Sequence, residues 1–244
     1  MNNNYVLACI DGASLTTAVC DYAAWMSQRA GAPLKLLHNI EHRPQAAVVD
    51  LSGSIGLGSQ EELLEELTRV EQQRNRLLMQ KGKLMLEAAT QRVEQAGVTN
   101  VEAWQQHGSL QESLVELETD IRVLVMGVRG EEHREGQLGA HLETVIRALH
   151  KPVLVVNAAF AVPKKIMLAY DGQDASRKAL DMVASSPVFK DIPCHLVYVG
   201  DESTASSVLN EAAAVLQTAG VSHELVNLPK GKSDATIRLR MIST

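Results

Sequence analysis

The strongest constraint on this chain is an internal repeat, in which one segment recurs 160 residues later without a gap. Residues 5–12 align with residues 165–172, and each segment is a short apolar run that ends in Asp-Gly. The register then holds further along, with Asp21 on Asp181, Ala24 on Ala184, Pro33 on Pro193 and Leu36 on Leu196. Because self-similarity at a fixed offset marks a duplicated structural unit, the chain contains two copies of one unit.

The first copy alternates short apolar runs with helical patterns. The runs are rich in Val, Leu and Ile and do not alternate with polar residues, which predicts strands buried on both faces. We expect strands at 5–10, 34–40, 98–106, 121–127 and 152–157, and helices at 14–30, 61–96, 110–118 and 139–149. Strands that alternate with helices imply right-handed crossovers. The predicted fold is therefore α/β, with a doubly wound, open, parallel five-stranded sheet.

The second copy supplies only part of this pattern. Its expected strands lie at 166–170, 194–199 and 222–228, and its expected helices lie at 174–186 and 203–219. We therefore expect a complete domain at 1–157, a linker at 158–164 and a partial domain at 165–244 that lacks the last two strands and the phosphate loop.

The composition limits which classes of partner and which cellular compartment are expected. The formal net charge is −6, and no run of Lys or Arg exceeds the pair Lys164-Lys165, which argues against nucleic acid and anionic membranes as partners. Cys9, Cys20 and Cys194 lie in apolar segments and are odd in number, as expected of reduced, buried thiols. With no apolar stretch near 18 residues, we expect a cytoplasmic protein.

Candidate binding residues follow the first and fourth strands. Asp11-Gly12 comes after the first strand and Gly127-Val128-Arg129-Gly130 after the fourth. Ligands of open parallel sheets bind at the carboxyl ends of strands where the strand order reverses. Glycine lets a ligand approach the backbone, and the helix that begins near Gly139 offers amide groups to phosphate. The spacing therefore predicts a nucleotide site.

Four segments together resemble the universal stress protein family. They are Asp11-Gly12, Val125–Gly130, Leu138–Glu143 and Lys151–Val156. The resemblance implies an adenine-nucleotide alpha-hydrolase-like fold, a role in stress response, and ATP or a related adenine nucleotide as ligand, with or without Mg²⁺. It implies that Asp11 and Gly12 lie near the ribose and metal, that the backbone at Asn39 and Ile40 meets adenine, and that Gly127, Gly130, Gly139, Ala140 and His141 form the phosphate region.

The phosphate motif departs from the family pattern, in which about nine residues separate the second glycine from a Gly-Ser or Gly-Thr pair. Here eight residues separate Gly130 from Gly139, and Ala140 follows where the hydroxyl residue is expected. A count of nine instead places Ala140 at the glycine and His141 at the hydroxyl. Loss of one hydroxyl donor costs about 1 kcal/mol. A working nucleotide site and a degenerate pocket kept for folding therefore both stay open.

Signals for catalysis are weak. The histidines, including His38 at a strand end, lack companions at metal-ligand spacing and are expected to be solvated, and Ser109 is expected to cap a helix. We expect action by binding, with at most weak ATP hydrolysis. The alternatives are an interaction scaffold and a nucleotide-dependent enzyme of a related α/β class. Such an enzyme is expected to carry a lysine or serine-rich motif where this chain has Gly12-Ala13-Ser14.

Two surfaces are candidates for association. The resemblance implies a homodimer paired through the strand at 152–157, and the uncovered sheet of the second copy is another candidate; a further protein partner is not identified. The long helix carries an apolar stripe at Leu63, Leu67, Val70, Leu77, Leu84, Ala88 and Ala96. We expect this stripe to contact the core, with a partner-helix surface as the alternative.

Overall fold

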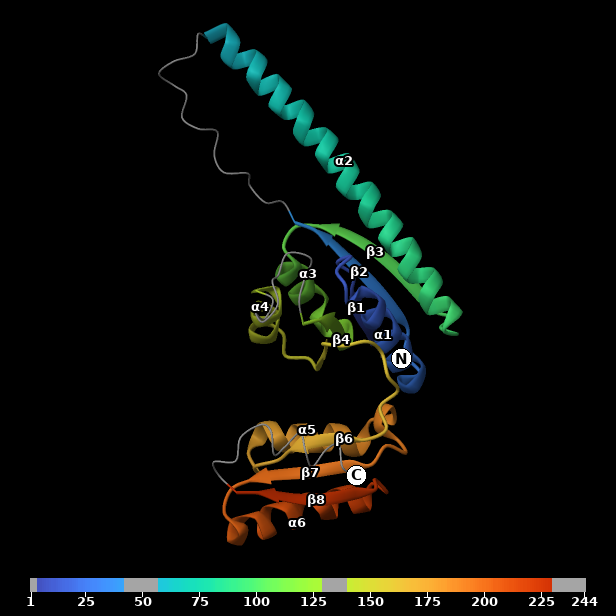
Figure 1. Ribbon diagram of the computed structural model, residues 1–244, viewed down its shortest axis with the longest axis vertical. Helices are drawn as coiled ribbons and strands as arrows, with labels where there is room; N and C mark the ends of the chain where they lie inside the picture. The colour runs from blue at the N-terminus through green and yellow to red at the C-terminus, as the bar shows by residue number, and fades with distance from the viewer. Residues whose placement is uncertain (1–3, 42–56, 129–139, 230–244) are drawn as a thin grey trace. The chain divides into compact units, whose positions relative to one another are not determined.

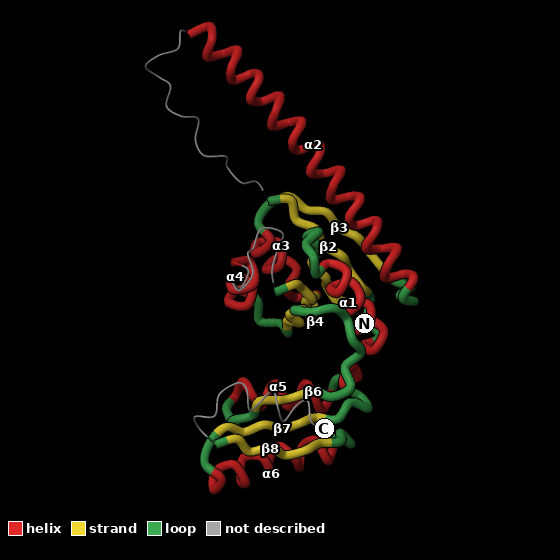
Figure 2. Tube along the Cα trace, viewed as in Figure 1, coloured by secondary structure: helices red, strands yellow, loops and turns green. Residues whose placement is uncertain are grey.

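A computed structural model describes residues 4–41, 57–128 and 140–229, with the side chains of all of these except 57–62, 140 and 141. The chain divides into two compact units, residues 1–160 and 161–244. Figure 2 shows helices and strands alternating along both units.

The first unit contains the expected alternation of strands and helices (Figure 1). Its strands are β1 (Tyr5–Cys9), β2 (Leu34–Ile40), β3 (Val101–His107), β4 (Ile121–Gly127) and β5 (Val153–Val156). Its helices are α1 (Thr16–Ala30), α2 (Leu57–Gln95), α3 (Leu110–Leu117) and α4 (Ala140–Ala148), with a short 3-10 turn at Glu118–Asp120.

All five strands of the first unit pair in parallel, in the order β3-β2-β1-β4-β5. The chain builds the sheet outward from β1 to β3 and then crosses back to β4, so the strand order reverses between β1 and β4. This topology confirms the doubly wound parallel sheet, and it puts the residues after β1 and β4 at the position where such sheets bind ligands.

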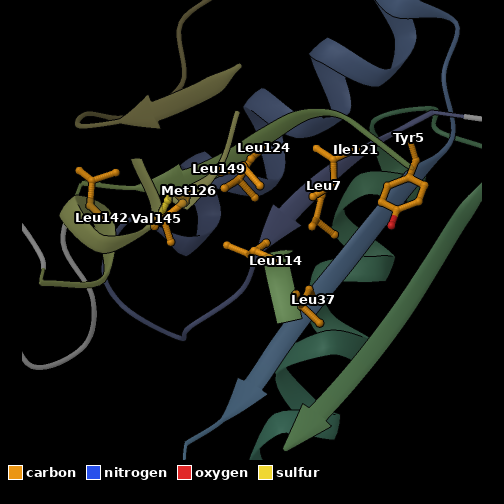
Figure 3. Packing of buried hydrophobic residues seen from close by; sticks show 10 residues of the cluster. All are labelled: Tyr5, Leu7, Leu37, Leu114, Ile121, Leu124, Met126, Leu142, Val145 and Leu149. Carbon is orange, nitrogen blue, oxygen red and sulfur yellow. The ribbon is translucent and has the colours of Figure 1, made fainter. Parts of the chain in front are cut away.

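Helices cover both faces of this sheet. α1 packs on β1 and β4, and α2 packs on β2, β3 and α1. The opposite face forms a core with α3 and α4, which Figure 3 shows as side chains from strands and helices that point toward one another. Leu7, Leu37, Leu114 and Leu124 are each at most 1% exposed there. Because these strands are buried on both faces, their sequences are continuous apolar runs and do not alternate between apolar and polar residues.

Helix α2 contradicts the expectation that its apolar stripe contacts the core. Leu63, Leu67, Val70, Leu77 and Leu84 are all exposed, with Leu77 at 60%. The helix instead meets the sheet through a different set of side chains, Leu86, Ala89 and Val93, which are buried. The helix also begins earlier than expected, at Leu57.

The second unit repeats the first half of the fold. Its elements are β6 (Ile166–Ala169), α5 (Asp174–Ser185), β7 (Cys194–Val199), α6 (Glu202–Thr218) and β8 (His223–Leu228), with a 3-10 turn at Pro187–Phe189. The sheet order is β6-β7-β8, and all pairs are parallel. Val6 pairs with Leu34 in the first copy, and Ile166 pairs with Cys194 in the second, so the offset of 160 is preserved in the strand register.

The two copies differ most between their second and third strands. α2 has 39 residues, whereas α6, its counterpart, has 17. Among the described residues, no helix is long and apolar enough to cross a membrane.

Candidate functional site

The loop after β1 is organised by Asp11. Its Oδ1 atom accepts hydrogen bonds from the Ala13 amide and the Thr16 hydroxyl, both at 2.9 Å. Gly12 between them has φ 79°, a left-handed conformation that glycine adopts without a steric penalty. Both bonds use Oδ1, and no bond from a described residue reaches Oδ2, so that oxygen is available to a ligand from this half-buried loop.

The second copy builds the same loop. Asp171 Oδ1 accepts from the Gln173 amide at 2.9 Å and from the Ser176 hydroxyl at 2.7 Å, and Gly172 has φ 78°. The hydrogen bonds from Ser176 and then from Gln173 lower the pKa of Asp171. The turn is therefore a property of the repeated unit, and by itself it does not identify a ligand site.

The Met85 side chain of helix α2 lies against Gly12 in the first of these loops, and Gly12 itself is exposed. A Cβ atom built on Gly12 would lie 2.5 Å from the Met85 sulfur, which is closer than non-bonded atoms approach. At Gly172 the nearest atom to such a Cβ is a Val208 methyl carbon at 3.6 Å, an ordinary contact. The positive φ therefore favours glycine at position 12, and any added side chain would also have to displace the flexible Met85 side chain.

A polar group that the second copy lacks lies at the ends of β2 and β3. Asn39 donates to the Ser113 hydroxyl at 2.7 Å, and Gln106 lies opposite Asn39 in the strand register. Within the described part of the chain, the side-chain carbonyl oxygens of both Asn39 and Gln106 are buried and accept no hydrogen bond. Each such oxygen costs about 1–3 kcal/mol when it loses water without a replacement donor.

The matching positions of the second unit are apolar. Val199 occupies the place of Asn39 at the same offset of 160, and it pairs with Leu228 as Asn39 pairs with Gln106. The surroundings of the two positions also differ, because Val199 is 51% exposed and α3, whose Ser113 contacts Asn39, has no counterpart among the described residues of the second unit. The second unit has one buried acceptor without a donor of its own, Asn227 Oδ1 on β8.

His38 is not solvated, which corrects the expectation from sequence. It is half-buried, and its Nδ1 lies 2.7 Å from the Ile10 carbonyl oxygen, so it links β2 to the residue before Asp11. Its ring also lies against Gly82 of α2, where an added Cβ would come within 2.5 Å of it. His42 and His133 lie outside the described residues.

The structure describes the phosphate region only in part. Gly127 ends β4 opposite Val156, and Ala140 and His141 open α4, although their side chains are not among those described. Gly130 and Gly139 lie outside the described residues. Asp11, Gly12, Asn39, Ile40 and Gly127 all lie at or just after the carboxyl ends of neighbouring strands, β1, β2 and β4.

Sequence reasoning missed three residues of this region, Gln106, Ser113 and Met85. The polar run Gln105-Gln106-His107 at a strand end was a usable signal for the first of them. Among the described residues, no group of three side chains is arranged to hold a metal ion. Ser109 precedes α3 as expected, but its side chain makes no capping bond; its carbonyl accepts from the Ser113 hydroxyl at 3.2 Å.

The cysteines are unpaired. Burial, with a smaller contribution from Asp11, raises the pKa of the Cys9 thiol to about 12. Burial likewise raises the pKa of Cys20 and of Cys194 to about 11. Since a thiol reacts as its thiolate, Cys9 is a poor nucleophile despite its place beside the loop.

Two comparisons with known proteins identify the same family. Residues 3–157 match the model of the universal stress protein family. The chain is 37% identical over 240 residues to universal stress protein Slr1230 of Synechocystis, which covers 96% of this chain and 84% of that protein.

One solved structure supports the fold. The crystal structure of a universal stress protein from Archaeoglobus fulgidus matches with a TM-score of 0.70 at 17% identity, over 99% of this chain and 84% of that one. A universal stress protein in complex with cAMP matches 65% of this chain and 100% of its own, with a TM-score of 0.43 at 22% identity.

Proposed function

Because the chain belongs to the universal stress protein family, we propose that it is a stress-response protein whose first unit binds an adenine nucleotide, and that it acts by binding rather than by catalysis. The second unit has no part in this binding. We also propose a cytoplasmic location, which suits three unpaired thiols.

The pair of buried acceptors, Asn39 Oδ1 and Gln106 Oε1, carries this proposal. A buried oxygen without a donor destabilises the free protein, so its presence calls for an explanation. Adenine supplies a suitable donor in its exocyclic amino group.

The order of the strands matches the order of groups in a nucleotide. Asn39 and Gln106 end β2 and β3, Asp11 follows β1, and Gly127 ends β4. Neighbouring strands lie about 4.8 Å apart, so two strand steps span roughly 10 Å, the scale of a nucleoside with its first phosphates. The base would lie toward β2 and β3, the ribose hydroxyls would reach the Asp11 carboxylate, and the phosphates would reach the glycines after β4.

The contacts proposed for the ribose and for the phosphates each suit the chemistry of the residues involved. The Asp11 carboxylate accepts from ribose hydroxyls through Oδ2, while Oδ1 keeps the loop in shape through Ala13 and Thr16. The absence of a side chain at Gly127 permits close approach of phosphate, and the amino-terminal end of α4 favours negative charge. When Mg²⁺ accompanies the nucleotide, it would neutralise phosphate charge.

Calorimetric titration of the full chain with ATP and Mg²⁺ tests the proposal. We expect one site per chain, with binding lost in Asp11→Ala. The matched control is Asp171→Ala, which removes the same loop bonds from the second copy and should leave binding unchanged. Equal loss in both variants, or no heat from the unmodified chain at millimolar ATP, would refute it.

Gln106→Leu provides a second, sharper variant because it copies the second unit. Removing a buried oxygen that accepts no bond from the described residues should stabilise the nucleotide-free protein by about 1 kcal/mol. The same change should weaken ATP binding, because the base loses an acceptor. A variant that becomes less stable and binds ATP normally would show that Gln106 serves the fold instead.

A further inference from the structure

The amino-terminal part of α2 extends beyond the body of the first unit (Figure 1). Of residues 63–77, only Asn75 is not exposed. Contact with the sheet begins near Met79, whose carbonyl accepts a hydrogen bond from Gln105, and Gly82 is the first buried residue. About five turns of helix therefore stand apart from the sheet, given 3.6 residues per turn.

This extension carries a heptad pattern on one flank. Leu63, Val70, Leu77 and Leu84 recur every seven residues, and Leu67, Arg74, Lys81 and Ala88 lie three or four residues from them. In coiled-coil terms the first set occupies d positions and the second set a positions. The four d residues are between 40% and 60% exposed. The d positions are apolar throughout, while Arg74 and Lys81 make two of the four a positions basic. An exposed apolar seam of this period is a candidate surface for pairing with another helix.

The surface of α2 is hollowed at the same period. One hollow, of about 480 Å³, is lined by Leu77, Gln80, Lys81, Leu84, Met85 and Ala88. The next, of about 450 Å³, is lined by Val70, Gln73, Arg74, Leu77, Leu78 and Lys81. Each residue of the second set precedes its counterpart in the first by seven positions. These hollows are wide and open, and each includes the set of four residues, at d, g, a and d positions, that receives one knob in a coiled coil.

We propose that this flank of α2 binds the same flank of α2 in a second copy of the chain, as an antiparallel coiled coil. The charges at the a positions decide the orientation. A parallel pair would set Arg74 against Arg74 of the partner subunit and Lys81 against Lys81 of the partner subunit. Like charges in direct contact disfavour that arrangement.

An antiparallel pair resolves this conflict. With the twofold axis near Gln72, Leu67 packs against Leu77 of the partner subunit, and Arg74 packs against Val70 of the partner subunit. Glu71 of the partner subunit then lines the same hole as that valine, so the guanidinium gains an opposite charge. This register uses residues 63–81, roughly 27 Å of helix, most of which precedes the contact with the sheet near Met79.

Such a short pair should be weak and dependent on concentration, because an isolated coiled coil of fewer than three heptads is marginal. Sedimentation of the full chain over a concentration series is the first test. Leu67→Glu with Leu77→Glu should weaken self-association roughly tenfold or more. Met79→Glu is the matched control, since Met79 is 48% exposed but lies on the opposite flank of α2.

The same measurement separates α2 from the other candidate surface. Association through the edge strand β5 would persist in the Leu67→Glu, Leu77→Glu variant. An unmodified chain that is monomeric at the highest concentration, or association that the double variant leaves intact, overturns the proposal. Circular dichroism of each variant checks that α2 still forms.

Disulfide trapping tests the orientation. Val70→Cys and Arg74→Cys chains, co-expressed with different tags, should cross-link to each other faster than either cross-links to itself, because 70 meets 74 across the antiparallel seam. A parallel pair would give the reverse result, with Val70→Cys chains joining each other. The unmodified chain, with its three native cysteines, sets the background.

Discussion

The repeat allows the packing of α2 over the candidate site to be tested by one substitution made in both copies. Gly12 and Gly172 occupy the same turn with φ 79° and 78°, so alanine is disfavoured equally by the backbone at both positions. That shared cost is about 1 kcal/mol. The two sites differ only in what the new methyl group meets.

At Gly12 the methyl carbon would lie 2.5 Å from the Met85 sulfur, and at Gly172 it would lie 3.6 Å from Val208. Because the half-buried Met85 side chain is flexible and can move aside, its overlap with a new methyl group costs about 0.5–1.5 kcal/mol, whereas an ordinary contact costs nothing. We therefore expect Gly12→Ala to destabilise the first unit by about 1.5–2.5 kcal/mol and Gly172→Ala to destabilise the second by about 1 kcal/mol.

Native-state hydrogen exchange measures both effects, because peptides from each sheet report the unfolding of their own unit. Met85→Ala should relieve the steric part, so that Gly12→Ala costs less in that background than in the unmodified chain. Equal costs at Gly12 and Gly172, or a cost at Gly12 that Met85→Ala does not change, would refute the placement of α2 over this loop.

Three further predictions concern ionisable groups in the described structure. Arg92 Nε and Nη2 donate to the Asp21 carboxylate at 2.7 and 2.8 Å, and Asp21→Asn removes this ion pair. Because Arg92 is 46% exposed, urea denaturation should show that the free energy of unfolding falls by only about 0.5–1 kcal/mol. The decrease should be smaller in high salt. The three thiols, with pKa values raised to about 11 or 12, should react slowly with a thiol reagent at pH 8 until the chain unfolds. Because the unfolded thiols ionise near pH 9, the free energy of unfolding should fall as the pH rises from about 9 toward 11, and a flat profile there would contradict the burial of the thiols.

The sheet was predictable from the sequence because its strands are buried on both faces. That burial removes the polar alternation of an exposed strand and leaves unbroken apolar runs such as the one ending at Cys9. The repeat predicted local structure that composition alone could not predict. Asp11 aligns with Asp171, and both residues form the same hydrogen-bonded turn. The pairing of β1 with β2 and the pairing of β6 with β7 are also related by the offset of 160 residues.

The orientation of α2 was not predictable in this way. Two faces of the helix carry apolar residues, one through Leu77 and Leu84 and the other through Leu86 and Val93. Periodicity identifies both, and only the contact with the sheet selects one. Gly82 was the available signal, because a glycine inside a helix marks a close approach, here to the ring of His38.

The polar pair at the ends of β2 and β3 was also not predictable from the sequence, because it depends on tertiary contacts. Asn39 and Gln106 lie 67 positions apart in the sequence, and only the parallel register of β2 and β3 brings them together. A sequence cannot show that two side-chain oxygens share a buried region without donors. The offset of 160 does match Asn39 with Val199, but the match of Gln106 with Leu228 was hidden because the shorter α6 shifts the alignment before β8.

Backbone amide chemical shifts recorded during a titration with ATP and Mg²⁺ would show which unit binds the nucleotide. We expect saturable shifts at Gly12, Asn39, Gln106 and Gly127, while Gly172, Val199 and Leu228 stay unchanged. Shifts of equal size in both units, or none in the first unit at millimolar ATP, would contradict this expectation.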